Sequence, residues 1–238
     1  MELIFQNKNL QIHHATFEYL NSNMYAVVEN RNALIIDPHK NMQVADFLRQ
    51  NLVKNLLILL THEHNDHTSG ILFFKKLFPN SPLIATNATS DYLADIKNAR
   101  PVLINFILKE QDHLNGTNLT EKFNQEFEPF CGKADIVFDK ELKLSWNNHC
   151  LKLIKTTGHS PGSCVIFLDD DFIFTGDSLM KDYPVVTRFP RGSKKDFCNK
   201  TLPFFASLNK NLKVFPGHGA AFFLKDLYKN GKLHVEFQ

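Results

Sequence analysis

The segment Thr61–His67, with the sequence Thr-His-Glu-His-Asn-Asp-His, constrains this chain more than any other feature. It places three imidazoles and a carboxylate within six positions, directly after the continuous apolar run Leu56–Leu60. Such a run is typical of a buried strand, and imidazole nitrogen and carboxylate oxygen are ordinary zinc donors. A loop that leaves a rigid strand can direct its first two histidines to one point, and its aspartate and third histidine to a second point nearby. We interpret the segment as a metal site rather than as a polar loop that contains histidines by chance.

Three further candidate ligands, His159, Asp177 and His218, lie on turns that contain glycine, next to predicted strands. Glycine lets the backbone bend sharply and approach a metal closely. One such histidine alone is more often an ordinary loop residue. Together with the histidine-rich segment, however, the three positions form a pattern that predicts ligands.

Short apolar runs separated by turns predict strands and helices throughout the chain. The predicted strands are Leu10–Phe17, Met24–Glu29, Ala33–Asp37, Leu56–Leu60, Pro82–Ala85, Ile136–Phe138, Leu142–Ser145, Leu151–Lys155, Cys164–Leu168, Phe172–Thr175 and Leu212–Phe215. The predicted helices are Met42–Leu52, Ile71–Phe78, Thr89–Ala94, Asp196–Leu208 and Ala221–Asn230. Two strand-rich halves with helices between and outside them predict a layered α/β sandwich.

Residues 98–130 differ in character from the rest of the chain. Pro101 suits the first position of a helix, and Leu103, Phe106 and Ile107 form an apolar stripe after it. We expect an inserted, mostly helical segment within a single domain that spans residues 1–238. Its role as a lid, a dimer contact or an extra covering of the core stays open.

Composition excludes several classes of protein. A hydrophobic share of 43% with 22% charged residues is that of a globular protein, and a net charge of +2 is too small to indicate nucleic acid or a membrane surface. We find no signal peptide, no apolar stretch near the roughly 20 residues that span a bilayer, and four cysteines without metal-site or disulfide spacing. These observations predict a soluble cytoplasmic protein that acts on a small molecule, and they leave homodimerisation open.

The order and spacing of the candidate ligands resemble the full ligand set of the metallo-β-lactamase superfamily. The set comprises His62, His64, Asp66, His67, His159, Asp177 and His218. The pair Asp37-Pro38 is similar to the family's early aspartate turn, and the resemblance extends from about residue 10 to residue 220. It implies a four-layer αβ/βα sandwich.

The resemblance also implies a binuclear metallo-hydrolase with two metal ions per chain. His62, His64 and His159 would hold one metal, Asp66, His67 and His218 the other, and Asp177 would bridge them. The donor types favour zinc, with iron or manganese as alternatives. A hydroxide that bridges the metals would attack a carbonyl, and Asp66 would have a catalytic role in orienting the attacking water.

Within the family, the segments around His159, Asp177 and His218 look closest to glyoxalase II-like hydrolases, which cleave thioesters such as hydroxyacylglutathione. The sequence ends about 20 residues after His218, so we expect a compact form without the C-terminal helical region that binds glutathione. Arg188 resembles the arginine of a loop that could bind an anionic part of the substrate, although it could equally belong to a basic loop that caps a helix. His39 stands where the family often has glycine, and we interpret it as a surface turn residue.

Other activities remain as alternatives. A persulfide dioxygenase-like enzyme would use a single iron held by a subset of the same histidines, and a lactonase or another hydrolase of this fold would keep the whole set. A nuclease is disfavoured by the small net charge, and a β-lactam hydrolase by the missing export signal. The sequence does not determine the physiological substrate, the metal, the oligomeric state or the role of residues 98–130.

Overall fold

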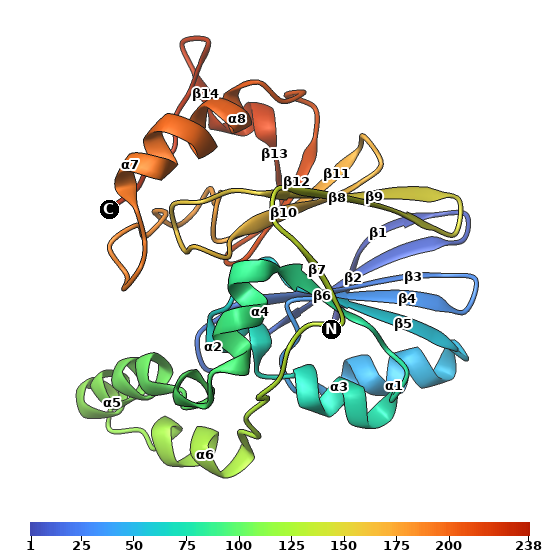
Figure 1. Cartoon of the computed structure of the whole chain (residues 1–238), viewed down its shortest axis with the longest axis vertical. Helices are drawn as coiled ribbons and strands as arrows, with labels where there is room; N and C mark the ends of the chain where they lie inside the picture. The colour runs from blue at the N-terminus through green and yellow to red at the C-terminus, as the bar shows by residue number, and fades with distance from the viewer.

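Two β-sheets face each other in the computed structural model, which describes all residues from Met1 to Gln238, and helices cover the outer sides of both sheets (Figure 1). The first sheet has seven strands in the order of the sequence. Strands β1 to β4 pair antiparallel, whereas β4 to β7 pair parallel. These strands are β1 (Glu2–Asn7), β2 (Leu10–Thr16), β3 (Asn23–Glu29), β4 (Asn32–Ile36), β5 (Asn55–Leu59), β6 (Leu83–Thr86) and β7 (Ile136–Phe138).

The second sheet has six strands in the order β13-β12-β11-β10-β9-β8. Its neighbours pair antiparallel except β11 and β12, which are parallel. The strands are β8 (Glu141–Trp146), β9 (His149–Lys155), β10 (Cys164–Leu168), β11 (Phe172–Gly176), β12 (Lys213–Pro216) and β13 (Phe222–Phe223). A separate hairpin consists of β14 (Tyr228–Lys229) and β15 (Lys232–Leu233).

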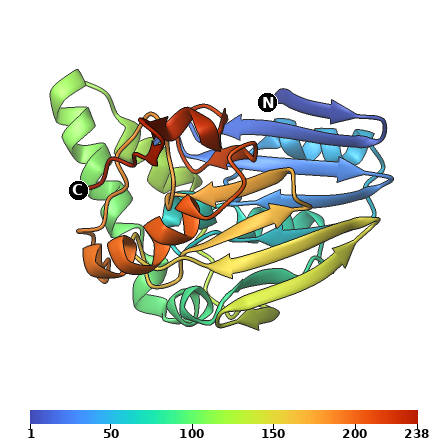
Figure 2. The same cartoon turned by 90° about the horizontal axis from the view of Figure 1, so that it is seen from above.

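Helices occupy the outer layers and one end of the sandwich. They are α1 (Met42–Gln50), α2 (Asn65–Thr68), α3 (Ile71–Leu77), α4 (Asn87–Ala94), α5 (Val102–Asn115), α6 (Leu119–Glu126), α7 (Lys194–Asp196) and α8 (Leu202–Ala206). Short 3-10 helices lie at Ile96–Ala99 and Leu224–Leu227, and a π-helix at Phe197–Thr201 joins α7 to α8. Figure 2 shows α5 at the same end of the sandwich as α7, away from the hairpins of the opposite end. No helix is both long and apolar enough to cross a membrane.

The apolar residues separate into clusters that hold the layers together. The largest cluster lies between the sheets and includes Ile12, Leu34, Ile36, Leu153, Ile166 and Phe174. A second cluster joins the outer face of the first sheet to α1 and α3 through residues such as Leu48 and Phe74. A third packs Phe205 of α8 against the outer face of the second sheet. Both faces of each sheet are therefore covered, and the predicted four-layer α/β sandwich is confirmed.

Two predictions near the C-terminus need correction. The helix predicted over Ala221–Asn230 is wrong, because Phe222 pairs with Val214 in a strand and Asn230-Gly231 forms a two-residue turn between β14 and β15. Both turn residues have positive φ, 50° and 76°, as a type I′ hairpin turn requires. The buried Leu224 and Leu227 mimicked a helical spacing that extends only over one short 3-10 helix.

The helix predicted over Asp196–Leu208 is present in pieces, as α7, the π-helix and α8. Pro203 lacks an N–H and lies at the start of α8. Strand β1, at the edge of the first sheet, was not predicted. Helices α5 and α6 fall within residues 98–130, where the sequence predicts an inserted helical segment.

Candidate metal centre

All seven predicted ligands lie at one edge of the two sheets, five of them on loops and Asp66 and His67 in the short helix α2. Strand β5 leads into the histidine-rich segment, β11 leads into Asp177 and β12 leads into His218. Because β11 and β12 are parallel neighbours, their carboxyl ends meet at the same edge. His159 lies on the loop between β9 and β10. Each segment that carries a predicted ligand thus follows a strand of one of the sheets, which limits its freedom to move.

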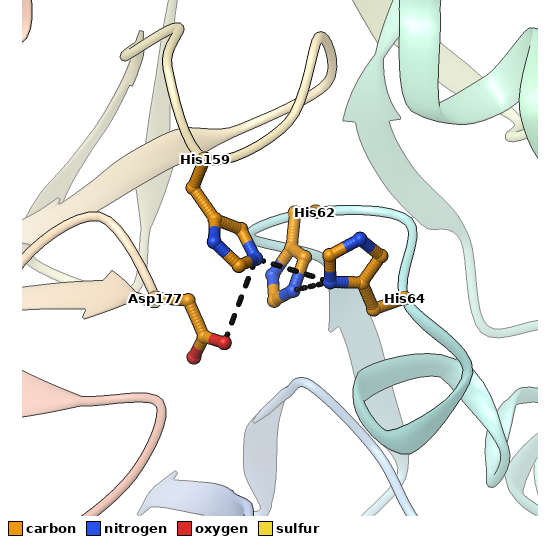
Figure 3. A group of neighbouring side chains, drawn as sticks. All are labelled: His62, His64, His159 and Asp177. Atoms are coloured by element: carbon orange, nitrogen blue, oxygen red, sulfur yellow. Dashed lines mark hydrogen bonds and ion pairs between the residues drawn. The ribbon is translucent and has the colours of Figure 1, made fainter. Parts of the chain in front are cut away.

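The first group of donors comprises His62, His64, His159 and Asp177 (Figure 3). Nε2 of His62 lies 3.1 Å from Nδ1 of His64, and Nε2 of His159 lies 3.0 Å from the same atom. Oδ2 of Asp177 lies 3.5 Å from Nε2 of His159. The four donor atoms are within 4.8 Å of one another, and three segments far apart in the sequence contribute them.

The second group comprises Asp66, His67 and His218. Oδ2 of Asp66 lies 3.2 Å from Nε2 of His67 and 3.5 Å from Nε2 of His218. Asp177 also reaches this group, since its Oδ1 is 3.5 Å from Nε2 of His67 and its Oδ2 is 3.6 Å from Nε2 of His218. The carboxylate of Asp177 therefore faces histidines of both groups.

Two buried atoms of this cluster, Nε2 of His67 and Oδ1 of Asp177, have no hydrogen-bond partner within the protein. Unpaired buried polar atoms are costly and therefore rare in proteins. Both atoms point toward the other donors, and a cation shared among these donors would satisfy them. The residues thus fit a metal on an observation that does not depend on the sequence motif.

The histidines of the first group favour the neutral form that binds metals. Burial lowers the pKa of His159 to about 4 and holds the pKa of His62 well below its usual range. Burial also lowers the pKa of His64. In the second group, burial acts in the same direction on His67, but the carboxylates of Asp66 and Asp177 outweigh it and raise its pKa well above the usual value. The two carboxylates therefore favour a positive charge at His67.

Hydrogen bonds donated by the outer ring nitrogens orient two of the histidines. Nδ1 of His159 donates to the carbonyl oxygen of Val186 at 2.8 Å, and Nδ1 of His67 donates to Asp37 at 3.2 Å. Each bond leaves Nε2 directed at the cluster. Asp37 itself accepts from the backbone N–H of Thr61 at 2.7 Å and from its hydroxyl at 2.5 Å. The early aspartate noted in the sequence is therefore a support for the ligands, and its φ of 55° places it in a turn that aspartate tolerates.

Glu63 is a buried residue of the site that the sequence analysis missed. It lies between two predicted ligands, and its Oε2 accepts from the hydroxyls of Ser160 at 2.9 Å and Thr89 at 3.2 Å. These bonds join the loop of His62 to the loop of His159 and to the start of α4. A Cβ on Gly162 would lie 2.2 Å from the same oxygen, so only glycine fits there. Its position inside a ligand motif concealed its different contacts.

The turn that carries His218 is held by the first sheet. Asn23 donates through its side chain to the carbonyl oxygens of Pro216 at 2.9 Å and Gly219 at 2.8 Å, and Tyr25 donates to Pro216 at 2.7 Å. A Cβ on Gly217 would lie 2.1 Å from Oδ1 of Asp177. The missing side chain of Gly217 is what allows this turn to approach the ligand carboxylate.

A cavity of about 370 Å³ opens above the two groups, with His64, Asp66, Asp177 and His218 at its base. One face of α5 lines it with Leu103, Ile104, Ile107 and Gln111. The segment 180–189 lines another side with Met180, Tyr183, Pro184, Val186 and Phe189. Helix α5 therefore lies directly over the base of the cavity.

Two residues singled out in the sequence lie elsewhere. Arg188 is exposed and is not among the residues that line the cavity, so its role in substrate binding stays a prediction. His39 is not a surface residue, because only 2% of it is exposed. Its ring packs on Phe17 with centroids 5.1 Å apart, and its backbone contacts Gly70 so closely that a Cβ on that glycine would lie 2.5 Å away.

The sequence model of the Metallo-beta-lactamase superfamily matches residues 18–218, which include every predicted ligand. The chain belongs to this superfamily. Among curated members, a probable metallo-hydrolase of Streptococcus pyogenes is 24% identical over 83% of this chain and 78% of its own length. Hydroxyacylglutathione hydrolase of Haemophilus ducreyi is 22% identical over 82% of this chain, and the match spans only 64% of that enzyme.

Solved structures of other proteins have the same fold. The crystal structure of the BLEG-1 B3 metallo-beta-lactamase covers 90% of this chain and 94% of its own, with a TM-score of 0.68 and 22% identity. The structure of TTHA1623 in a di-iron-bound form covers 90% and 95%, with a TM-score of 0.65 and 20% identity. At these identities the likeness establishes the superfamily's architecture and not a substrate.

Proposed function

We propose that this chain is a binuclear metal-dependent hydrolase that cleaves a small thioester. The observation that carries the proposal is the convergence of seven donors in two groups, with Asp177 facing both groups at the base of a cavity. His62, His64 and His159 would hold one metal, and Asp66, His67 and His218 the second. Bound metals of this kind supply an acidified water and polarise a carbonyl oxygen.

The chain's own residues would position these reactants. The carboxylate of Asp66 is 11% exposed, and the residue lines the cavity, where it can orient the attacking water by accepting a hydrogen bond. The bonds from His159 to Val186 and from His67 to Asp37 would keep the ligands in place while charge develops on the carbonyl oxygen.

The cavity lining supports a thioester over an oxygen ester. Among the side chains that line the cavity there is no lysine, and no histidine or carboxyl group outside the predicted ligands, and Tyr92 and Tyr183 carry the only other ionisable side chains. A thiolate, whose conjugate acid has a pKa of about 8.5, leaves near neutral pH without protonation by a general acid. The similarity to hydroxyacylglutathione hydrolase supports the same class of substrate.

Metal analysis of the purified protein, combined with hydrolysis assays on thioesters, lactones and phosphodiesters, tests the proposal. We expect two metal ions per chain, zinc above iron or manganese, and the highest kcat/KM for thioesters. His64→Ala should abolish activity, whereas His113→Ala, which changes an exposed histidine of α5, should not. One iron per chain with oxygen uptake, or activity that survives in His64→Ala, would show that the proposal is wrong.

A further inference from the structure

The walls of the cavity differ sharply from its base. We use the name apolar wall for Leu103, Ile104, Ile107, Met180, Val186 and Phe189. Three of these side chains come from α5 and three from the segment that follows Asp177. Polar side chains other than the ligands lie around them as uncharged amides and phenols, namely Asn21, Asn65, Tyr92, Gln111, Tyr183 and Gln238.

No lysine or arginine lines this cavity, and its side-chain carboxylates are those of the predicted ligands Asp66 and Asp177. An anionic group held against the apolar wall, away from the metals proposed at the base, would therefore lose its hydration without gaining a cationic partner, which is strongly unfavourable. Apolar groups, in contrast, gain free energy for each methylene that they bury against such a wall. The volume of about 370 Å³ is near the lower end of the range of roughly 300–1000 Å³ for small-molecule sites.

From this lining we infer that the substrate presents an uncharged, apolar acyl chain of medium length to the apolar wall. The inference rests on the proposed thioester hydrolysis and deepens it by naming the acyl group. Helix α5 then determines specificity for the acyl group, because its residues Leu103, Ile104 and Ile107 line the cavity. Val102 and Phe106, on the other side of the same helix, are 68% and 63% exposed.

Arg191 lies near the cavity and could instead favour a substrate with an anionic tail. Its guanidinium lies 5.8 Å from the ring of Tyr92, which lines the cavity, but Arg191 is exposed and does not line the cavity itself. A substrate with an anionic tail would need this arginine, and its preference for that tail would disappear in Arg191→Gln.

Hydrolysis of N-acetylcysteamine thioesters with acetyl, butanoyl, heptanoyl and adipoyl groups tests the inference. We expect kcat/KM to rise about threefold per methylene from acetyl to heptanoyl. Adipoyl, similar in length to heptanoyl but with a terminal carboxylate, should be cleaved at least 30-fold less efficiently. Equal rates for acetyl and heptanoyl, or a preference for adipoyl, would overturn the inference while leaving thioester hydrolysis intact.

Variants of α5 place a cation in the cavity or outside it. Ile107→Lys should raise the adipoyl-to-heptanoyl ratio of kcat/KM at least tenfold, and Gln111→Lys provides the same test at a position that is already polar. Val102→Lys adds the same charge to the exposed face and should leave the ratio within twofold. If the adipoyl-to-heptanoyl ratio were unchanged in both Ile107→Lys and Gln111→Lys, α5 would not bind the acyl group.

Binding of an uncleavable analogue separates this inference from the proposed function. Calorimetry with the ketone analogue of the heptanoyl thioester, in which a methylene replaces sulfur, should show tighter binding than the acetyl analogue and a negative heat-capacity change. Such binding without cleavage of any thioester would refute the proposed reaction and support the apolar wall. No difference between the analogues would refute the wall.

Discussion

The base and the wall of the cavity are built in opposite ways. The seven predicted ligands lie at the base or just beneath it, where Asp37 and the carbonyl of Val186 accept from two of the histidines and Asn23 donates to the turn of His218. The apolar wall consists of side chains from α5 and one loop, with contacts that are mostly apolar. We therefore expect the base to tolerate less displacement than the wall.

Among the variants that test this difference, removal of the Asp177 carboxylate should have the largest effect on activity. Asp177→Ala deletes the carboxylate that faces both donor groups, so we expect fewer than two metals per chain and a loss of at least 1000-fold in kcat/KM, in line with the several kcal/mol that metal catalysis supplies. Metal analysis and thioester hydrolysis measure both results. Asp170→Ala, at an exposed aspartate, is the matched control, and full activity with two metals in Asp177→Ala would contradict the assigned base.

A pair of glycine variants compares base and wall directly. In Gly217→Ala the new Cβ would lie 2.1 Å from Oδ1 of Asp177, so we expect a loss of at least 100-fold in kcat/KM and a free energy of unfolding lower by about 1–3 kcal/mol. Gly116 follows the last residue of α5 with a φ of 65°, and a Cβ added there would meet nothing within 4 Å. Gly116→Ala should therefore lower the free energy of unfolding by only about 1 kcal/mol and change kcat/KM little. Urea unfolding and kinetics measure the pair. Equal losses of activity would show that the base is no more constrained than the wall.

Sequence predicted the base far better than the wall, for a physical reason. Metal ligands need particular atoms at strand ends, so His62, His159 and Asp177 are visible as residue types at fixed spacings. An apolar wall needs only volume and hydrophobicity, which Leu103 and Ile107 share with any core residue. The sequence therefore predicted α5 as an apolar helix but could not determine its role.

The sequence also did not predict which polar residues are buried. His39 follows a turn and was assigned to the surface, yet it fits between Phe17 and the backbone near Gly70. That position depends on two segments meeting in space. The wrong helix over Ala221–Asn230 has the same origin, because pairing of Phe222 with Val214 overrides a helical spacing.

His39 should make the free energy of unfolding depend on pH. Burial lowers its pKa in the folded protein to about 4, below the value of about 6.5 in the unfolded chain. As the pH falls, the unfolded chain takes up the proton first, so the stability from neutral His39 is complete above pH 6.5, decreases between pH 6.5 and 4, and changes no further below. With chelator present, the wild type should lose about 2 kcal/mol more than His39→Gln between pH 7 and 5.

Urea unfolding at both pH values measures this difference. His14→Gln, which changes a half-buried histidine within β2, serves as the control for substitution of a histidine. If the free energy of unfolding depended on pH in the same way in the wild type and in His39→Gln, His39 would be protonated in the folded chain without loss of stability. The surroundings of His39 would then accommodate a charge without cost.

Among the variants of the base, Glu63→Ala should lower kcat/KM the least, because Glu63 supports the base without being a predicted ligand. Glu63→Ala leaves the hydroxyls of Ser160 and Thr89 without their acceptor, so we expect about a tenfold lower kcat/KM and an unfolding free energy lower by about 1–3 kcal/mol. Glu63→Gln keeps an oxygen that can accept both bonds and should recover most of the activity. If Glu63→Gln were as impaired as Glu63→Ala, the charge rather than the hydrogen bonds would matter. The two loops would then be joined through the electrostatics of the metal centre, and the base would depend on more than its packing.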